Sequence, residues 1–224
     1  MSRDIAWVAG RMKGEIHSDP LSRRVVLLHG IWNAKVWLAP LAARLREAGF
    51  EPDILGYPSV FSGPDATLPG LIQHISAGGE TALVGHSLGG MMALEALRHA
   101  PDLPVTRVVC LGSPLRGSDT ARQVAGLGWA APVLGLSADL LQRGFERWEG
   151  NAEVGMVAGN IPKGVGRLFS AFEGDSDGTV AVEETRLPGL ADHCVVASSH
   201  SGLVFSADAA RQAVAFLRDG RFEP

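Results

Sequence analysis

The chain reads as a series of short, β-branched apolar runs separated by longer segments with helical periodicity. Strands that alternate with helices are typical of a parallel sheet, because a helix is the usual crossover between parallel neighbours. The pattern therefore predicts an α/β fold with a mostly parallel sheet of about six strands and helices on both faces. The expected strands are residues 25–30, 52–57, 81–86, 107–112, 154–159 and 193–198.

Two segments carry clear helix signals. Between the first two predicted strands, Leu41 and Leu45 fall on one helical face, and Gly49 is placed to end the helix. Near the end of the chain, Ser206 can cap a helix that runs to Gly220. We expect both helices to pack an apolar face on the sheet.

Residues 118–151 do not fit this alternation. Leu141, Phe145 and Trp148 recur there at i, i+4 and i+7, which predicts an apolar helical stripe. One interpretation is a short lid or cap, inserted after the fourth strand, whose apolar underside covers a site. The other is an ordinary crossover helix that packs on the sheet. The sequence leaves both interpretations open.

Length and composition are those of a single globular domain over residues 1–224. The chain is 46% hydrophobic with a mean hydropathy of +0.13, enough to bury a full core. A net charge of −4, without an extended basic run, excludes the usual signature of a nucleic-acid binder. Cys110 and Cys194 each lie within an apolar run, so we expect reduced core cysteines.

The N-terminal residues show no long apolar stretch, and Asp4 stands where a signal peptide would be apolar. We therefore expect no secretory signal and no membrane span, and a cytoplasmic location. Arg143, Glu146 and Arg147 in the candidate lid make stable membrane insertion unexpected, although contact with a membrane surface stays open.

A serine flanked by glycines occurs in "LVGHSLGGMM", residues 83–92. The pattern G-x-S-x-G appears twice, at residues 85–89 and 174–178. Only the first match follows a strand-like run and precedes a helix-favouring segment, the frame of a nucleophile elbow. We therefore predict that Ser87 is a nucleophile and that Ser176 belongs to a loop.

A serine nucleophile needs a histidine to accept its proton, and seven histidines compete for that role. His200 follows the carboxyl end of the last predicted strand, where sites in open α/β sheets collect. His29 and His86 lie beside the turns themselves, from where the chain does not easily bring them round to the Ser87 hydroxyl. We predict His200 as the base. The four remaining histidines, which are less suitably placed for this role, are His17, His74, His99 and His193.

The acid that orients this histidine is expected in "EGDSDGTV", which offers Glu173, Asp175 and Asp177. Asp177 and the glycine after it form a turn before a β-prone run, which favours Asp177, with Asp175 as the alternative. The oxyanion is expected to bind the backbone N–H groups of Ile31 and Leu88. Ile31 comes just after the first predicted strand, and Leu88 comes just after the nucleophile.

These residues together resemble the α/β-hydrolase superfamily, and within it the small bacterial lipases and esterases. The resemblance runs from "VVLLHGIW" through "LVGHSLGG" and "LGSPLRGS" to "DGTV" and "SHSG". It implies the roles of nucleophile for Ser87, acid for Asp177 and base for His200. It also implies an oxyanion hole formed by Ile31 and Leu88.

The chain departs from that pattern in two places. Only about 24 residues precede the first predicted strand, so we expect a reduced α/β-hydrolase fold. In it, the two leading strands would be missing or replaced by a helix near residues 5–12. Ser201 and Gly202 follow His200 where larger lipases of this kind carry a calcium-binding aspartate, so no metal is expected.

The sequence thus predicts an esterase or lipase without a cofactor, acting on a small-molecule ester through an acyl-enzyme intermediate. A thioester, lactone or amide substrate stays open, as does a non-catalytic binding protein with this fold. An apolar acyl part of the substrate is expected to contact a lining formed by Trp32, Leu115, Trp129, Phe145 and Leu203.

Overall fold

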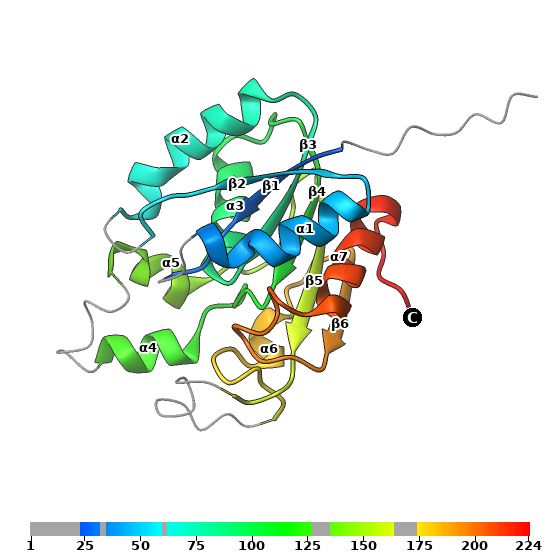
Figure 1. Ribbon diagram of the computed structural model, residues 1–224. Coiled ribbons are helices and arrows are strands. Elements are labelled where there is room, and N and C mark those ends of the chain that lie inside the picture. The colour runs from blue at the N-terminus through cyan, green and yellow to red at the C-terminus, as the bar shows by residue number, and fades with distance from the viewer. Residues whose placement is uncertain (1–22, 32–34, 60–61, 127–134, 164–173) are drawn as a thin grey trace, which may run out of the picture.

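The computed structural model describes residues 23–31, 35–59, 62–126, 135–163 and 174–224 (Figure 1). Its centre is a six-stranded sheet in the order β2-β1-β3-β4-β5-β6, and every neighbouring pair is parallel. The predicted α/β class and all six predicted strands are confirmed, with boundaries shifted by at most two residues. The strands are β1 Arg24–Leu28, β2 Glu51–Leu55, β3 Thr81–His86, β4 Val105–Leu111, β5 Glu153–Gly159 and β6 Asp192–Val196.

Helices cover both faces of this sheet, as predicted. The helices α1 and α7 lie side by side on one face, and α2 and α3 pack together on the other (Figure 1). The helices are α1 Ala39–Glu47, α2 Pro64–Ala77, α3 Leu88–His99, α4 Asp119–Gly126, α5 Ala138–Arg143, α6 Val182–Thr185 and α7 Ala207–Asp219, with short 3-10 turns η1 Lys35–Leu38 and η3 Gly135–Ser137.

Alternation along the strands divides the core into two layers. In β1, Val26 and Leu28 point toward α2 and α3, whereas Val25 and Leu27 point toward α1 and α7. All four side chains are fully buried. Because helices cover both faces of the sheet, the inner strands β1, β3, β4 and β5 are almost entirely buried and largely apolar, which made them recognisable in the sequence. The edge strands β2 and β6 are partly exposed and carry acidic residues.

The predicted helix ends are confirmed. The Ser206 hydroxyl accepts a hydrogen bond from the backbone N–H of Ala209 at the start of α7. Gly220 ends that helix in the left-handed conformation, with φ of 70°. Gly49, two residues beyond α1, has φ of 91°, which glycine adopts without strain.

The predicted apolar stripe within residues 118–151 is not a continuous helix, so that prediction is wrong. Helix α5 ends at Arg143, because Gly144 turns the chain with φ of 58° and a Cβ there would lie 2.1 Å from the backbone nitrogen of Gly117. Phe145 and Trp148 are still buried, in the core layer that contains α3. A lid role for this segment stays a prediction.

Both cysteines are free: Cys110 is buried and Cys194 partly so. Within the described ranges, no helix is long and apolar enough to cross a membrane. The helix expected near residues 5–12 lies outside the described residues.

Candidate active site

Ser87 lies on the sharp turn that joins β3 to α3, as the motif predicts. Its backbone has φ of 55° and ψ of −120°, and it is the only non-glycine residue with positive φ in the part of the chain that the structure describes. Such a conformation costs on the order of 1–3 kcal/mol and persists only where surrounding contacts impose it. One of these contacts is the hydrogen bond from the Ser87 N–H to the carbonyl of Leu111, at the end of the neighbouring strand β4.

The glycines around the serine are required by close packing of the turn. A Cβ on Gly85 would lie 2.3 Å from the backbone nitrogen of Gly90, so strand and helix could not meet as they do. A Cβ on Gly89 would lie 2.2 Å from the carbonyl oxygen of Leu28, at the end of β1. Glycine at both positions lets α3 begin directly against the sheet and leaves the Ser87 side chain projecting from it.

Three side chains that are far apart in the sequence form a continuous hydrogen-bonded chain at this turn. The Ser87 hydroxyl lies 3.0 Å from Nε2 of His200, and Nδ1 of His200 lies 2.7 Å from Oδ2 of Asp177. Since a carboxylate only accepts, Nδ1–H of His200 donates to Asp177, which leaves Nε2 to accept from the Ser87 hydroxyl. This arrangement can move a proton from a serine to an imidazole.

Asp177 is held by its own loop. Its Oδ1 accepts hydrogen bonds from the backbone N–H groups of Thr179 and Val180, while its main-chain carbonyl accepts from the N–H of His200. The residue is 1% exposed, and a buried carboxylate needs such partners. Asp175, the alternative, is exposed, and Glu173 lies outside the described residues. The geometry therefore brings Asp177 to His200.

A second pair of glycines makes room for Asp177 and His200. Gly112, at the end of β4, has φ of 57°, and a Cβ there would lie 3.2 Å from Oδ2 of Asp177 and 3.3 Å from Nδ1 of His200. A Cβ on Gly159, the last residue of β5, would lie 3.0 Å from Cβ of Asp177. The carboxyl ends of two central strands thus lie directly beneath this pair.

The predicted oxyanion donors lie on two adjoining segments. Leu88 is the first residue of α3, where backbone N–H groups lack an acceptor within the helix and the helix dipole favours negative charge. Ile31 follows β1 and packs on the core layer that contains α3. The close approach of Gly89 to the carbonyls of Leu28 and His29 brings the two segments together.

Tyr57 fixes the segment that carries Ile31, a contact that sequence reasoning missed. Its hydroxyl donates to the carbonyl of His29, its N–H donates to Nε2 of His29 at 3.3 Å, and the two rings stack 4.4 Å apart. Nδ1–H of His29 then donates to the carbonyl of Gly30 at 2.9 Å. Burial lowers the pKa of His29 and so favours this neutral form. The only signal in the sequence was the position of Tyr57 at the end of the predicted strand 52–57.

The predicted substrate lining is only partly described. Leu115 and Leu203 are fully buried, and Phe145 is 7% exposed. Leu115 and Phe145 belong to the core layer with α3, whereas Leu203 lies against Gly112 beneath the acid and base. Trp32 and Trp129 lie outside the described residues. A contact between any of these five and a substrate stays a prediction.

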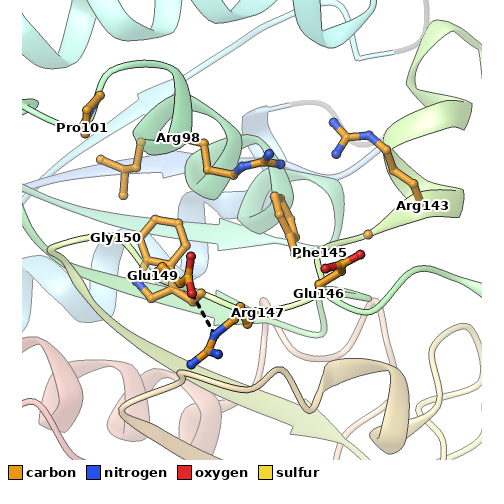
Figure 2. A pocket seen from close by; sticks show the side chains of 11 residues that line it. Arg98, Pro101, Arg143, Phe145, Glu146, Arg147, Glu149 and Gly150 are labelled. Atoms are coloured by element: carbon orange, nitrogen blue, oxygen red, sulfur yellow. Dashed lines mark ion pairs between the residues drawn. The ribbon is translucent and has the colours of Figure 1, made fainter.

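A cavity of about 580 Å³ lies at the opposite end of α3 from Ser87, against the segment of residues 143–150 (Figure 2). Arg98 and Arg143, on its rim, both pair with the buried carboxylate of Glu95, and Arg147 pairs with Glu149. Arg143 also pairs with Asp139, so each of these arginines has an acidic partner within the protein. Within the described ranges, no cluster of three or more His, Cys, Asp or Glu side chains could hold a metal ion.

Comparison with known proteins shows the family and the fold of the chain. A model of the Alpha/beta hydrolase family matches residues 25–215, whereas no curated protein matches the chain. Among solved structures, the mature lipase of Bacillus licheniformis is 22% identical with a TM-score of 0.67, over 91% of this chain and 95% of that one. A monoacylglycerol lipase of Paleococcus ferrophilus is 18% identical with a TM-score of 0.56, over 86% of this chain and 93% of that one. A phospholipase of Legionella pneumophila is 17% identical with a TM-score of 0.58, over 73% of this chain and 45% of that one.

Proposed function

The chain belongs to the alpha/beta hydrolase family, and from that premise we propose that it hydrolyses carboxylic esters with Ser87 as nucleophile. The observation that carries the proposal is the chain of hydrogen bonds from Ser87 through His200 to Asp177. A binding protein with this fold has no need to keep a strained serine, a base and an oriented acid in hydrogen-bond contact. The alignment of all three favours an enzyme.

In the first half of the reaction, Oγ of Ser87 attacks the ester carbonyl carbon while its proton moves to Nε2 of His200. Asp177 stabilises the imidazolium that forms. The negative charge that develops on the carbonyl oxygen is directed to the N–H groups of Ile31 and Leu88, each of which is worth about 3 kcal/mol by analogy with other hydrolases. The bond to the leaving alcohol then breaks, and the proton on Nε2 passes to the alkoxide oxygen.

In the second half, water attacks the acyl-serine ester, and Nε2 of His200 accepts a proton from it. The same N–H donors stabilise the second oxyanion. When the bond from the acyl carbon to Oγ breaks, the proton returns from His200 to Ser87. The products are the free acid and the resting enzyme, so one histidine acts as base and acid in both halves.

We further propose an apolar acyl group as the substrate's main feature. Two exposed aromatic side chains support this: Trp37 of η1 and Phe205, beyond His200 in the same loop, meet edge to face at 5.7 Å. Contiguous exposed apolar surface can mark a binding site. The structural relatives named as lipases and phospholipases point the same way, toward esters of lipids.

The test is hydrolysis of p-nitrophenyl esters with acyl chains of two to sixteen carbons, comparing the wild type with Ser87→Ala. Loss of a triad serine costs on the order of a millionfold in kcat. We expect turnover by the wild type and none above background by the variant, and the chain-length profile separates a small-ester enzyme from a lipase. A folded wild type that cleaves no ester, thioester or lactone would overturn the proposal in favour of a binding protein.

A further inference from the structure

The mechanism leaves one buried histidine of the catalytic motif without a role. We propose that His86 is a positioning residue, which holds the main chain of the base His200 so that its imidazole reaches Ser87. This inference rests on the proposed function, since it assigns His200 the part of the base. It concerns the variable position before the nucleophile in G-x-S-x-G.

The contact is direct. Nε2 of His86 lies 3.0 Å from the carbonyl oxygen of His200, and the two rings lie 4.9 Å apart. Because a carbonyl only accepts, Nε2 of His86 must carry the hydrogen and donate it. Two consecutive residues of the turn therefore hold His200 from two sides: His86 at its main chain and Ser87 at its side chain.

His86 is suited to donate this bond at every pH where the enzyme would work. It is 1% exposed, and burial, together with the neighbouring His200, lowers its pKa to about 3. Among the described residues, the titratable groups whose charge acts on the pKa of His86 are His200, Asp177 and His29. A neutral His86 therefore adds no second positive charge beside the imidazolium that forms on His200 during the reaction.

His200 needs such support because it lies in a loop. The segment of residues 197–206 connects β6 to α7, and regular ladder bonds do not fix it. The N–H of His200 donates to the carbonyl of Asp177 at 3.0 Å, and its own carbonyl accepts from His86. One bond thus ties the main chain of His200 to the last residue of β3, and the other ties it to the loop that carries Asp177. Together they set the orientation of the imidazole.

The experiment compares His86→Phe with His86→Gln. Phenylalanine keeps the ring volume without the donor, whereas glutamine places an N–H at a similar reach from the backbone. We expect His86→Phe to lower kcat by about 100-fold, the scale of a misplaced catalytic group. KM should stay within about twofold, since ester binding does not use His86, and His86→Gln should recover most of kcat.

The matched control is His193→Phe. This histidine also bonds through Nε2, to the hydroxyl of Thr185 at 2.8 Å, but at the other end of the sheet from the triad. It should lose thermal stability without losing kcat. Two outcomes would overturn the positioning role. One is an equal loss of kcat in His86→Phe and His86→Gln that follows the loss of melting temperature. The other is a kcat of His86→Phe equal to that of the wild type.

A second readout does not need turnover. In ¹⁵N-histidine-labelled protein, the Nδ1–H of His200, bonded to Asp177, should shift or broaden in His86→Phe and stay unchanged in His86→Gln and His193→Phe. If the wild type cleaves nothing while these spectra change as described, the proposed function fails, and the spectra show only that His86 fixes the conformation of His200. If esters are cleaved in a Ser87-dependent way but neither kcat nor the spectra respond to His86→Phe, the positioning role fails alone.

Discussion

Two buried carboxylates are used in opposite ways in this protein. Asp177, 1% exposed, accepts two backbone N–H groups and bonds to His200. Glu95, 5% exposed, pairs with two guanidinium groups, Arg98 of its own helix and Arg143 of α5. Both satisfy the rule that a buried charge needs partners. They differ in whether those partners are permanently charged.

This difference separates a group available for chemistry from one used for architecture. The amides fix Asp177 in place without neutralising it, so its charge can stabilise an imidazolium that exists only during reaction. The charge of Glu95 is already balanced by arginines, which tie α3 to the segment of residues 138–143. We therefore expect changes at Asp177 to affect activity and changes at Glu95 to affect stability.

The largest effect is expected from Asp177→Asn. The amide keeps the size of the side chain but favours the wrong imidazole tautomer, so kcat should fall by about 10⁴-fold, as in comparable triads. The melting temperature should change little, and ester hydrolysis beside thermal unfolding measures both. Asp175→Asn, at the exposed alternative two residues earlier, should leave kcat unchanged. If Asp175→Asn were the damaging variant, the assignment of the acid would be wrong.

A smaller loss is expected from Gly112→Ala, which disturbs the Asp177–His200 pair without altering either side chain. The added Cβ would lie 2.7 Å from Leu203 and near both catalytic partners, so we expect kcat to fall by about 10- to 100-fold. Gly49→Ala is the control for backbone strain alone, since φ there is 91° and nothing lies within 4 Å. Its stability should fall while kcat is retained. Equal kcat for both variants would contradict the steric argument.

Glu95→Gln should leave kcat unchanged and lower the free energy of unfolding by about 1–3 kcal/mol. This loss of stability is smaller than the loss expected when a fully buried ion pair is broken, because Arg98 and Arg143 are half exposed and remain solvated. Urea unfolding measures it. Glu149→Gln, which breaks an exposed pair with Arg147 on the same cavity, should cost less than about 0.5 kcal/mol. A fall in kcat with Glu95→Gln would contradict the view that Glu95 serves stability while Asp177 serves activity.

The last effect concerns the pH dependence of stability. The folded pKa of His86 is lowered to about 3, so its contribution to stability is full above pH 6.5 and is lost as the pH falls from 6.5 toward 3. One such group gives a slope of about 1.4 kcal/mol per pH unit below 6.5. Urea unfolding at pH 7 and pH 5 should show a shallower acid loss in His86→Gln than in the wild type.

Other titrating groups do not disturb that comparison. Burial lowers the pKa of His29 and His193 in the same sense, and it raises the pKa of Glu184, which acts in the opposite sense. All three are present in both proteins, so they cancel in the difference. Identical acid losses in wild type and His86→Gln would mean that His86 is not the buried neutral group described here.

Local pattern was sufficient for much of the fold and for part of the site. The inner strands followed from apolar runs, because both of their faces are buried. The partly exposed edge strands β2 and β6 followed from shorter apolar stretches. The caps of α7 followed from Ser206 and Gly220, because capping is a local interaction. The helix proposed through Trp148 was wrong, because its apolar positions are buried by an irregular segment that turns at Gly144. Apolar periodicity indicates which side chains are buried, but it does not distinguish a regular helix from an irregular buried segment.

What the sequence determined by itself is the set of parts: alternating strands and helices, a glycine-flanked Ser87 between them, and a histidine beyond the last strand. These depend on neighbours in the chain, whose chemistry can be inferred from residue order. Only the tertiary structure brought Asp177 rather than Asp175 to His200, gave Glu95 its arginines and brought His86 to the carbonyl of His200. Those contacts join residues up to 114 positions apart, and their partners are set by how strands and helices pack.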